Sequence, residues 1–140
     1  NIQVQGANPK RTIILTAGGA IPTTTNGCAA FTKTELETND VMIGSLDFDK
    51  TTSESAQWNL VMPDNWDAGT LTARFYWTAS GGTAAQTVKW GIQGRSYADD
   101  EALDQAPGTA VTTSDAYIAA NDLHISSESS AITITGATAG

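Results

Sequence analysis

Apolar and polar residues alternate in short runs along the chain, and Gly, Asn, Asp and Pro separate these runs. In a β-strand, such alternation turns every second side chain to the same face of the sheet. The most regular run covers 70–78, with inward positions Leu71, Ala73, Phe75 and Trp77. A second run covers 87–95, with inward positions Val88, Trp90, Ile92 and Gly94. Together they predict an antiparallel hairpin joined at 80–83, with a bulge near Gly91 or Gly94.

Less regular runs predict further strands at 11–15, 40–48, 57–62, 123–126 and 131–135. Their expected inward positions are Val41, Ile43, Leu46, Phe48, Trp58, Leu60, Met62, Leu123, Ile125, Ile132 and Ile134. Pro63 ends the run at 57–62 because proline has no backbone N–H to donate. The polar residues 127–130 predict a turn between the last two strands.

One short helix is expected at 97–106, where acidic residues in the first turn suit the positive end of a helix dipole. About six to eight strands and this helix predict an all-β fold, an antiparallel β-sandwich or a jelly-roll-like arrangement. The expected organisation is an N-terminal arm and first strand at 1–24 and a β-sandwich domain at 25–136. A linker-like tail follows at 137–140.

The composition mainly excludes certain classes of partner. Charged residues make up 16% of the chain, against about 25% in an average domain, and 21 Thr and 10 Ser supply much of the polar surface. Seven basic and 15 acidic residues give a net charge of −8. Nucleic-acid sites and electrostatic contacts with anionic membranes both need clustered Lys and Arg. We therefore expect no nucleic-acid partner and no membrane insertion.

Catalytic and metal chemistry have little to build on. With Cys28 and His124 as the single Cys and His, neither a disulfide nor a Cys/His zinc site can form within the chain. Oxygen ligands for a cation occur in two acidic clusters, and a carboxylate pair suited to glycoside hydrolysis flanks Trp66. These acids are Asp47 and Asp49; Asp99, Asp100, Glu101 and Asp104; and the pair Asp64 and Asp67. Neither cluster has a recognised ligand spacing, so we expect no metal, no cofactor and no catalytic residue.

Aromatic side chains offer the remaining recognition chemistry, because such rings stack on the faces of sugars. Trp58, Trp77 and Trp90 lie at inward positions of predicted strands, which favours core packing. Trp66 lies in the predicted turn 62–69, and Tyr76 lies on the polar face of its strand. Trp66 and Tyr76 are therefore the candidates for surface recognition.

The run 62–79 resembles a segment of virion structural proteins of tailed bacteriophages. It reads Met-Pro-Asp-Asn-Trp-Asp-Ala-Gly-Thr-Leu-Thr-Ala-Arg-Phe-Tyr-Trp-Thr-Ala. Similar segments follow the family's order at 25–29, 46–49, 88–93, 97–104, 121–125 and 130–134. The resemblance covers roughly 25–136, and its members are similar to tail-fibre, appendage or head-surface proteins. Members of the family usually continue with an Arg-Asp and a Leu-Gly-Val stretch, which do not follow Gly140. This difference implies either truncation or strand exchange with a neighbouring chain.

The resemblance implies a non-enzymatic structural component on the exterior of a phage or phage-like particle, either in a tail fibre or appendage or as capsid decoration. Expected partners are copies of the same chain and other virion proteins, with assembly in the host cytoplasm. The alternative is a carbohydrate-binding module that recognises a host cell-surface glycan through Trp66 and Tyr76. A hydrolase that uses Asp64 and Asp67 is a third hypothesis.

Overall fold

The computed structural model of the chain describes residues 11–138, which fall into two compact units that meet between Val61 and Met62. This boundary lies inside the range 25–136, for which the sequence predicts one domain. The described residues contain eight strands and a single 3-10 turn, so the all-β class is confirmed. No helix among residues 11–138 is long and apolar enough to cross a membrane.

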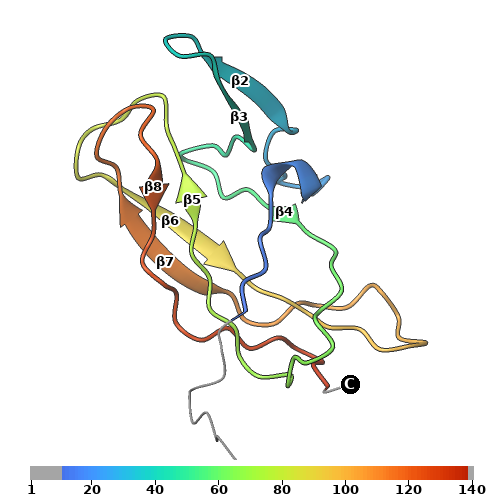
Figure 1. Ribbon diagram of the computed structural model, residues 1–140. Coiled ribbons are helices and arrows are strands. Elements are labelled where there is room, and N and C mark those ends of the chain that lie inside the picture. Colours follow the sequence, from blue (N-terminus) through green and yellow to red (C-terminus); the bar gives the residue numbers. More distant parts are fainter. Residues whose placement is uncertain (1–10, 139–140) are drawn as a thin grey trace, which may run out of the picture. The chain divides into compact units, whose positions relative to one another are not determined.

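The first unit contains η1 (Ala17–Gly19), β1 (Ile21–Pro22), β2 (Thr32–Leu36), β3 (Val41–Ser45) and β4 (Ala56–Gln57). β1 pairs with β4 in antiparallel register. β2 pairs with β3, also antiparallel (Figure 1). The strand predicted at 11–15 is wrong, since these residues belong to no strand. β3 confirms the strand predicted at 40–48 over five residues only, and β4 keeps only the start of the strand predicted at 57–62.

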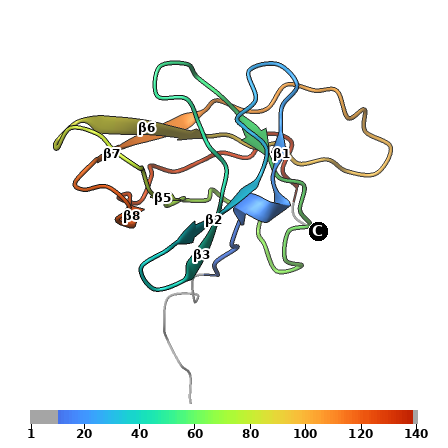
Figure 2. The same ribbon diagram turned by 90° about the horizontal axis from the view of Figure 1, so that it is seen from above.

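The second unit contains β5 (Tyr76–Trp77), β6 (Thr87–Ile92), β7 (Val111–Ala116) and β8 (His124–Ile125). β5 pairs with β8, and β6 pairs with β7, both antiparallel. The predicted hairpin between 70–78 and 87–95 is therefore wrong, although both runs keep their inward and outward faces. Figures 1 and 2 show the two small sheets facing each other within this unit. The β-sandwich or jelly-roll arrangement stays a prediction.

An irregular series of cross-chain hydrogen bonds replaces the predicted turn at 127–130. The segment 124–132 runs antiparallel to 71–77, with Ser126 opposite Phe75, Ser129 opposite Ala73 and Ile132 opposite Leu71. From one bonded pair to the next, the chain advances by three residues in 124–132 but by two residues in 71–77. The segment 124–132 therefore has one extra residue at each step, as in a β-bulge. This spacing buries Ser126, Ser129 and Ile132. It also explains why period-two alternation fails in this segment.

The register predicted for 123–126 is also wrong. Leu123 and Ile125 are exposed, whereas His124 and Ser126 are buried. The inward positions predicted at 131–135 fare better, since Ile132 is buried and Ile134 is half-buried. No bulge occurs at Gly91, which pairs with Thr112 in an uninterrupted β6–β7 ladder.

The helix predicted at 97–106 does not form. Side chains hold this segment as a loop: the Tyr97 hydroxyl donates to the Leu103 carbonyl at 2.7 Å, and the Ala98 N–H donates to Glu101 Oε2 at 3.1 Å. Leu103 is exposed, so a helix here would have no apolar face to bury. Short helices without such packing are marginal in water.

Candidate functional site

The centre of the second unit is a stack of rings around His124. The His124 ring lies 4.3 Å from the Trp77 ring and 5.7 Å from the Tyr117 ring, and it stacks on both. Only 4% of His124 is exposed. The β5–β8 pairing sets this arrangement, because Trp77 and His124 are direct cross-strand partners. Such pairs are the main stabilising contacts of a small sheet.

Hydrogen bonds fix the tautomer of His124. The Ile118 N–H donates to Nε2 at 3.0 Å, and Nδ1 lies 3.1 Å from the Asp122 carbonyl oxygen. A backbone N–H can only donate, so Nε2 accepts and Nδ1 carries the proton. The ring is therefore neutral and joins β8 to the segment that follows β7. With both nitrogens occupied, His124 serves as a structural residue.

Trp77 connects this stack to the facing sheet. Its Nε1–H donates to Asp115 Oδ2 of β7 at 2.8 Å. Its ring lies 6.2 Å from that of Trp90, which stacks on Phe75 at 5.7 Å. The aromatic core predicted for 70–78 and 87–95 is therefore present between the two sheets. Together with the ladder of 71–77, it gives the β5–β8 sheet a fixed inner side.

The outer side of the same sheet is apolar and open. Tyr76 pairs with Ile125 across the strands, and 66% of the Tyr76 residue is exposed. Leu123, on the same side of the chain as Ile125, is also exposed. Together, Tyr76, Leu123 and Ile125 form what we call the β8 patch. Exposed apolar groups of this size, close together, are typical of interaction surfaces.

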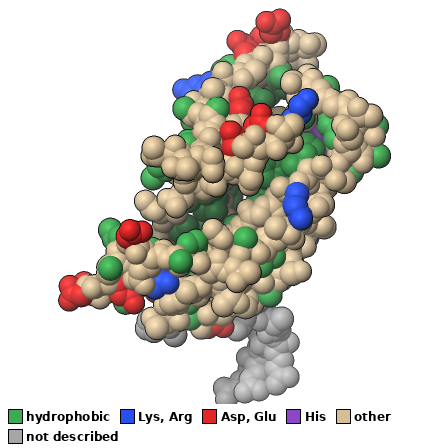
Figure 3. Space-filling view, turned by 180° about the vertical axis from the view of Figure 1, so that it is seen from behind, with side chains coloured by type: hydrophobic (Ala, Val, Ile, Leu, Met, Phe, Trp, Pro, Cys, Tyr) green, Lys and Arg blue, Asp and Glu red, His purple; other side chains and the backbone are tan. Residues whose placement is uncertain are grey.

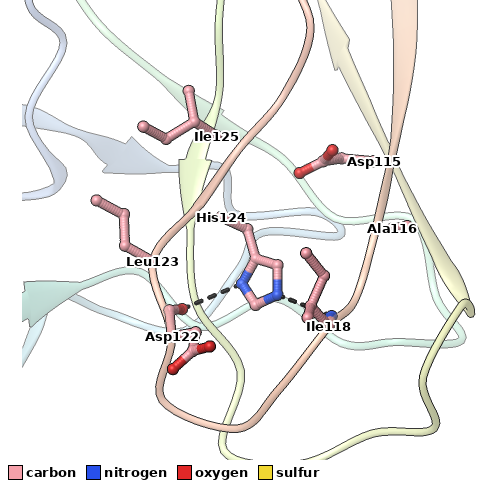
Figure 4. Close-up of a pocket in the computed structure, with 7 residues that line it drawn as sticks. All are labelled: Asp115, Ala116, Ile118, Asp122, Leu123, His124 and Ile125. Carbon is pink, nitrogen blue, oxygen red and sulfur yellow. Dashed lines mark hydrogen bonds between the residues drawn. The ribbon is translucent and has the colours of Figure 1, made fainter.

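A hollow of about 140 Å³ lies beside this patch, between the end of β7 and β8 (Figure 4). Its lining residues are Asp115, Ala116, Ile118, Asp122, Leu123, His124 and Ile125. Figure 4 shows Asp115 and Ile118 on the side of the His124 ring, while the side chains of Leu123 and Ile125 point the other way. Among the described residues, neither Asp115 nor Asp122 has an ion-pair partner. The hollow is therefore acidic, and it opens at the edge of β8.

That edge of β8 is available for pairing. The Ser126 N–H donates to the Phe75 carbonyl at 2.9 Å, so the next pair, Ile125 and Tyr76, is of the kind that does not exchange backbone hydrogen bonds. The N–H and C=O of Ile125 consequently point away from β5. No described residue bonds to them. An open strand edge of this kind is a template for another strand.

The two residues predicted for surface recognition differ in their surroundings. Tyr76 is exposed as expected and lies in the β8 patch. Trp66 is half-buried in a turn where its N–H donates to the Pro63 carbonyl at 2.8 Å, and its indole N–H is buried without a hydrogen-bond partner among the described residues. No ring contact joins Trp66 to Tyr76 within residues 11–138. The structure therefore does not combine them in one stacking surface.

Two of the acidic side chains, Asp49 and Asp67, accept hydrogen bonds from residues two or three positions later in the chain. Asp67 Oδ1 accepts from the Gly69 N–H at 2.9 Å, three residues after Asp64 in the sequence. Asp49 Oδ1 accepts from the Thr51 hydroxyl at 2.6 Å and from the N–H groups of Thr51 and Thr52. These bonds, led by that of the hydroxyl, lower the pKa of Asp49 to about 2. No cluster of three potential metal ligands, whether at 47–49 or at 99–104, occurs among the described residues.

Cys28 is buried in the first unit. Burial, reinforced by the nearby negative charges of Glu54 and Asp47, raises the pKa of its thiol above the usual 9.0. A protonated and enclosed thiol is a poor nucleophile.

Sequence reasoning missed the β8 patch, apart from Tyr76, and the hollow next to it. The predicted register placed Leu123 and Ile125 inside, so their exposure was not expected. Because the sequence of β7 is mostly polar, no strand is predicted there, and Asp115 is not among the predicted site residues. The signal that could have found the site is the even spacing of His124, Ser126 and Ile132, because counting back from Ile132 by twos places Leu123 and Ile125 on the outer face. Comparison of the chain with protein-family models, with curated proteins and with solved structures found no match.

Proposed function

We propose that this chain is a non-enzymatic structural component on the exterior of a phage or phage-like particle, where it assembles with copies of itself and with other particle proteins. The observation that carries this proposal is the small share of apolar side chains that the chain buries by itself. Among residues 11–138, four apolar residues are buried, whereas sixteen large ones are exposed. A chain of this length normally encloses a larger core.

The β2–β3 hairpin supports the same proposal. Of its ten strand residues, only Leu36, Ile43 and Ser45 are half-buried, and Val41 and Met42 are exposed. A two-stranded hairpin without an apolar face packed on a partner is marginally stable in water. Neighbouring chains in a particle would provide that packing. Figure 3 shows apolar side chains at many points of the displayed surface, with few basic ones between them.

The resemblance of 62–79 to virion proteins of tailed bacteriophages supports assembly in a phage or phage-like particle. The experiment is quantitative mass spectrometry of purified particles of the phage that encodes the chain. The proposal expects a copy number that is a multiple of the symmetry of the tail or the capsid. A trace amount, unrelated to particle symmetry, contradicts it.

One observation favours a second candidate, recognition of a host glycan. The exposed ring of Tyr76 next to Ile125 presents a flat apolar surface of the kind that stacks on sugars. Particles that carry Tyr76→Ala should then lose binding on an array of host polysaccharides, whereas particles with Tyr97→Ala should keep it. Equal binding by both variants excludes this role for Tyr76.

A further inference from the structure

The segment that precedes η1 has the composition of a strand but no strand partner. Three of its residues are β-branched and favour extended structure, namely Thr12, Ile13 and Ile14. Leu15 follows them. None of the backbone N–H or C=O groups of these four residues bonds to another described residue. Ile14 is 80% exposed, and Ile13 and Leu15 are exposed as well. An apolar, extended segment with unbonded backbone groups has what is needed to add as a strand to an open sheet edge.

The free edge of β8 also has backbone groups without a bond to another described residue. Ile125 presents one N–H and one C=O outward, and the apolar side chains of Leu123 and Ile125 flank them. A strand added here would place alternate side chains beside Ile125 and toward the acidic hollow. The charges also agree, since Arg11 immediately precedes the apolar segment and the hollow contains Asp115 and Asp122.

We propose that residues 11–15 of one copy of the chain add as a strand to the free edge of β8 in a second copy. The added strand supplies the missing backbone bonds of Ile125 and covers the β8 patch. This inference rests on the proposed function, because the exchange requires an assembly in which the chain is repeated. The proposed function requires contacts between copies of the chain, and this strand exchange is one such contact.

Disulfide cross-linking between two different variants tests the contact directly. Each variant contains Cys28→Ala and one new cysteine, at Ile13, Ile14, Val61 or Ile125. Since successive residues of a strand face opposite sides, either Ile13 or Ile14 lies on the side of Ile125. We expect I13C or I14C, mixed with I125C and oxidised, to give about tenfold more cross-linked dimer than V61C mixed with I125C, because pairing raises the local thiol concentration. Val61 is the matched control because it is apolar and 93% exposed.

Self-association of the chain without added cysteines is the second measurement. Ile14→Lys places a charge in the donated segment, and Ile125→Pro removes the outward N–H while leaving the bonds to β5 in place. Both should weaken self-association in sedimentation velocity by about tenfold, or 1.4 kcal/mol, whereas Val61→Lys should not. Near-UV circular dichroism of the four tryptophans shows that each variant is folded.

Three results overturn the inference. The first is equal cross-linking of the V61C and I14C mixtures. The second is a chain with both I14C and I125C that forms its disulfide only within one molecule. The third is undiminished self-association of I14K and I125P. If the chain self-associates but does not cross-link, this contact is wrong while the proposed function stands. A chain that is absent from purified particles contradicts the proposed function itself.

Discussion

Ser126 replaces a backbone bond opposite Phe75 by using its side chain. The Ser126 N–H donates to the Phe75 carbonyl at 2.9 Å, and the Phe75 N–H donates to Ser126 Oγ at 3.0 Å. Ser129 repeats the arrangement with Ala73, at 2.9 Å and 3.0 Å. Each hydroxyl also donates to the carbonyl of the next residue. Two serines three residues apart therefore keep an irregular ladder bonded while it gains one residue at each step.

The first prediction concerns these hydroxyls. Ser126→Ala and Ser129→Ala should each lower the free energy of unfolding by about 1–3 kcal/mol, since a part-buried backbone N–H then loses its acceptor. Urea unfolding followed by tryptophan fluorescence measures the change. Ser130→Ala, at an exposed position of the same segment, should change the free energy little. If all three variants unfold alike, the hydroxyl bonds do not support the ladder.

The second prediction separates the two contributions of His124. His124→Phe keeps a ring between Trp77 and Tyr117 but removes the acceptor for the Ile118 N–H, and should cost about 1–3 kcal/mol. His124→Ala also loses the stacked ring and should cost more, with an added loss of about 0.5–1.5 kcal/mol for the aromatic contacts. Chemical denaturation of both variants gives the comparison. Equal stability of His124→Phe and the unchanged chain contradicts the role assigned to Nε2.

The third prediction follows from the lowered pKa of Asp49. A carboxyl whose pKa is lower in the folded chain stabilises that state above its unfolded pKa, 3.8, and this contribution is lost as the pH falls toward about 2. The amide signals of Thr51 and Thr52 in a nuclear magnetic resonance titration should therefore move with a midpoint near 2. Asp49→Asn should abolish this transition, whereas Asp99→Asn should leave it. A midpoint near 3.8 contradicts the bonded geometry.

The fourth prediction concerns the Cys28 thiol. Because its pKa is raised in the folded chain, the thiol stabilises this state below pH 9.0, and the contribution is lost as the pH rises above that value. Alkylation at pH 8 should be slow in the folded chain and fast in urea. Cys28→Ala should remove the part of the alkaline loss of stability that comes from this thiol. Rapid alkylation without denaturant contradicts the enclosed position.

The sequence predicts the parts of the fold in which apolar residues mark one face. Leu71 to Trp77 and Val88 to Ile92 alternate as the pattern requires, because their inward side chains build the aromatic core. The pattern misses β2 and β7, where Thr, Ser, Lys, Glu and Asp occupy most positions and backbone pairing determines the strand. It also misassigns the partner of 70–78, since the choice between β6 and β8 depends on contacts distant in sequence.

The candidate site was harder to predict than the fold. Tyr76 is a surface candidate in the sequence because it lies on the polar face of a regular strand. The apolar character of Leu123 and Ile125 predicts inward positions for them, whereas β8 turns His124 inward and leaves both of them exposed. The segment 12–15 is strand-like in sequence but belongs to no strand in the structure, which is the relationship that the proposed exchange explains.

Imaging of an intact particle tests the central claim most directly. Cryo-electron microscopy of purified particles should locate this chain on the exterior, in copies related by the symmetry of the tail or capsid, with the β2–β3 hairpin packed against neighbouring chains. Particles whose exterior density accounts for every protein without this chain would contradict the account.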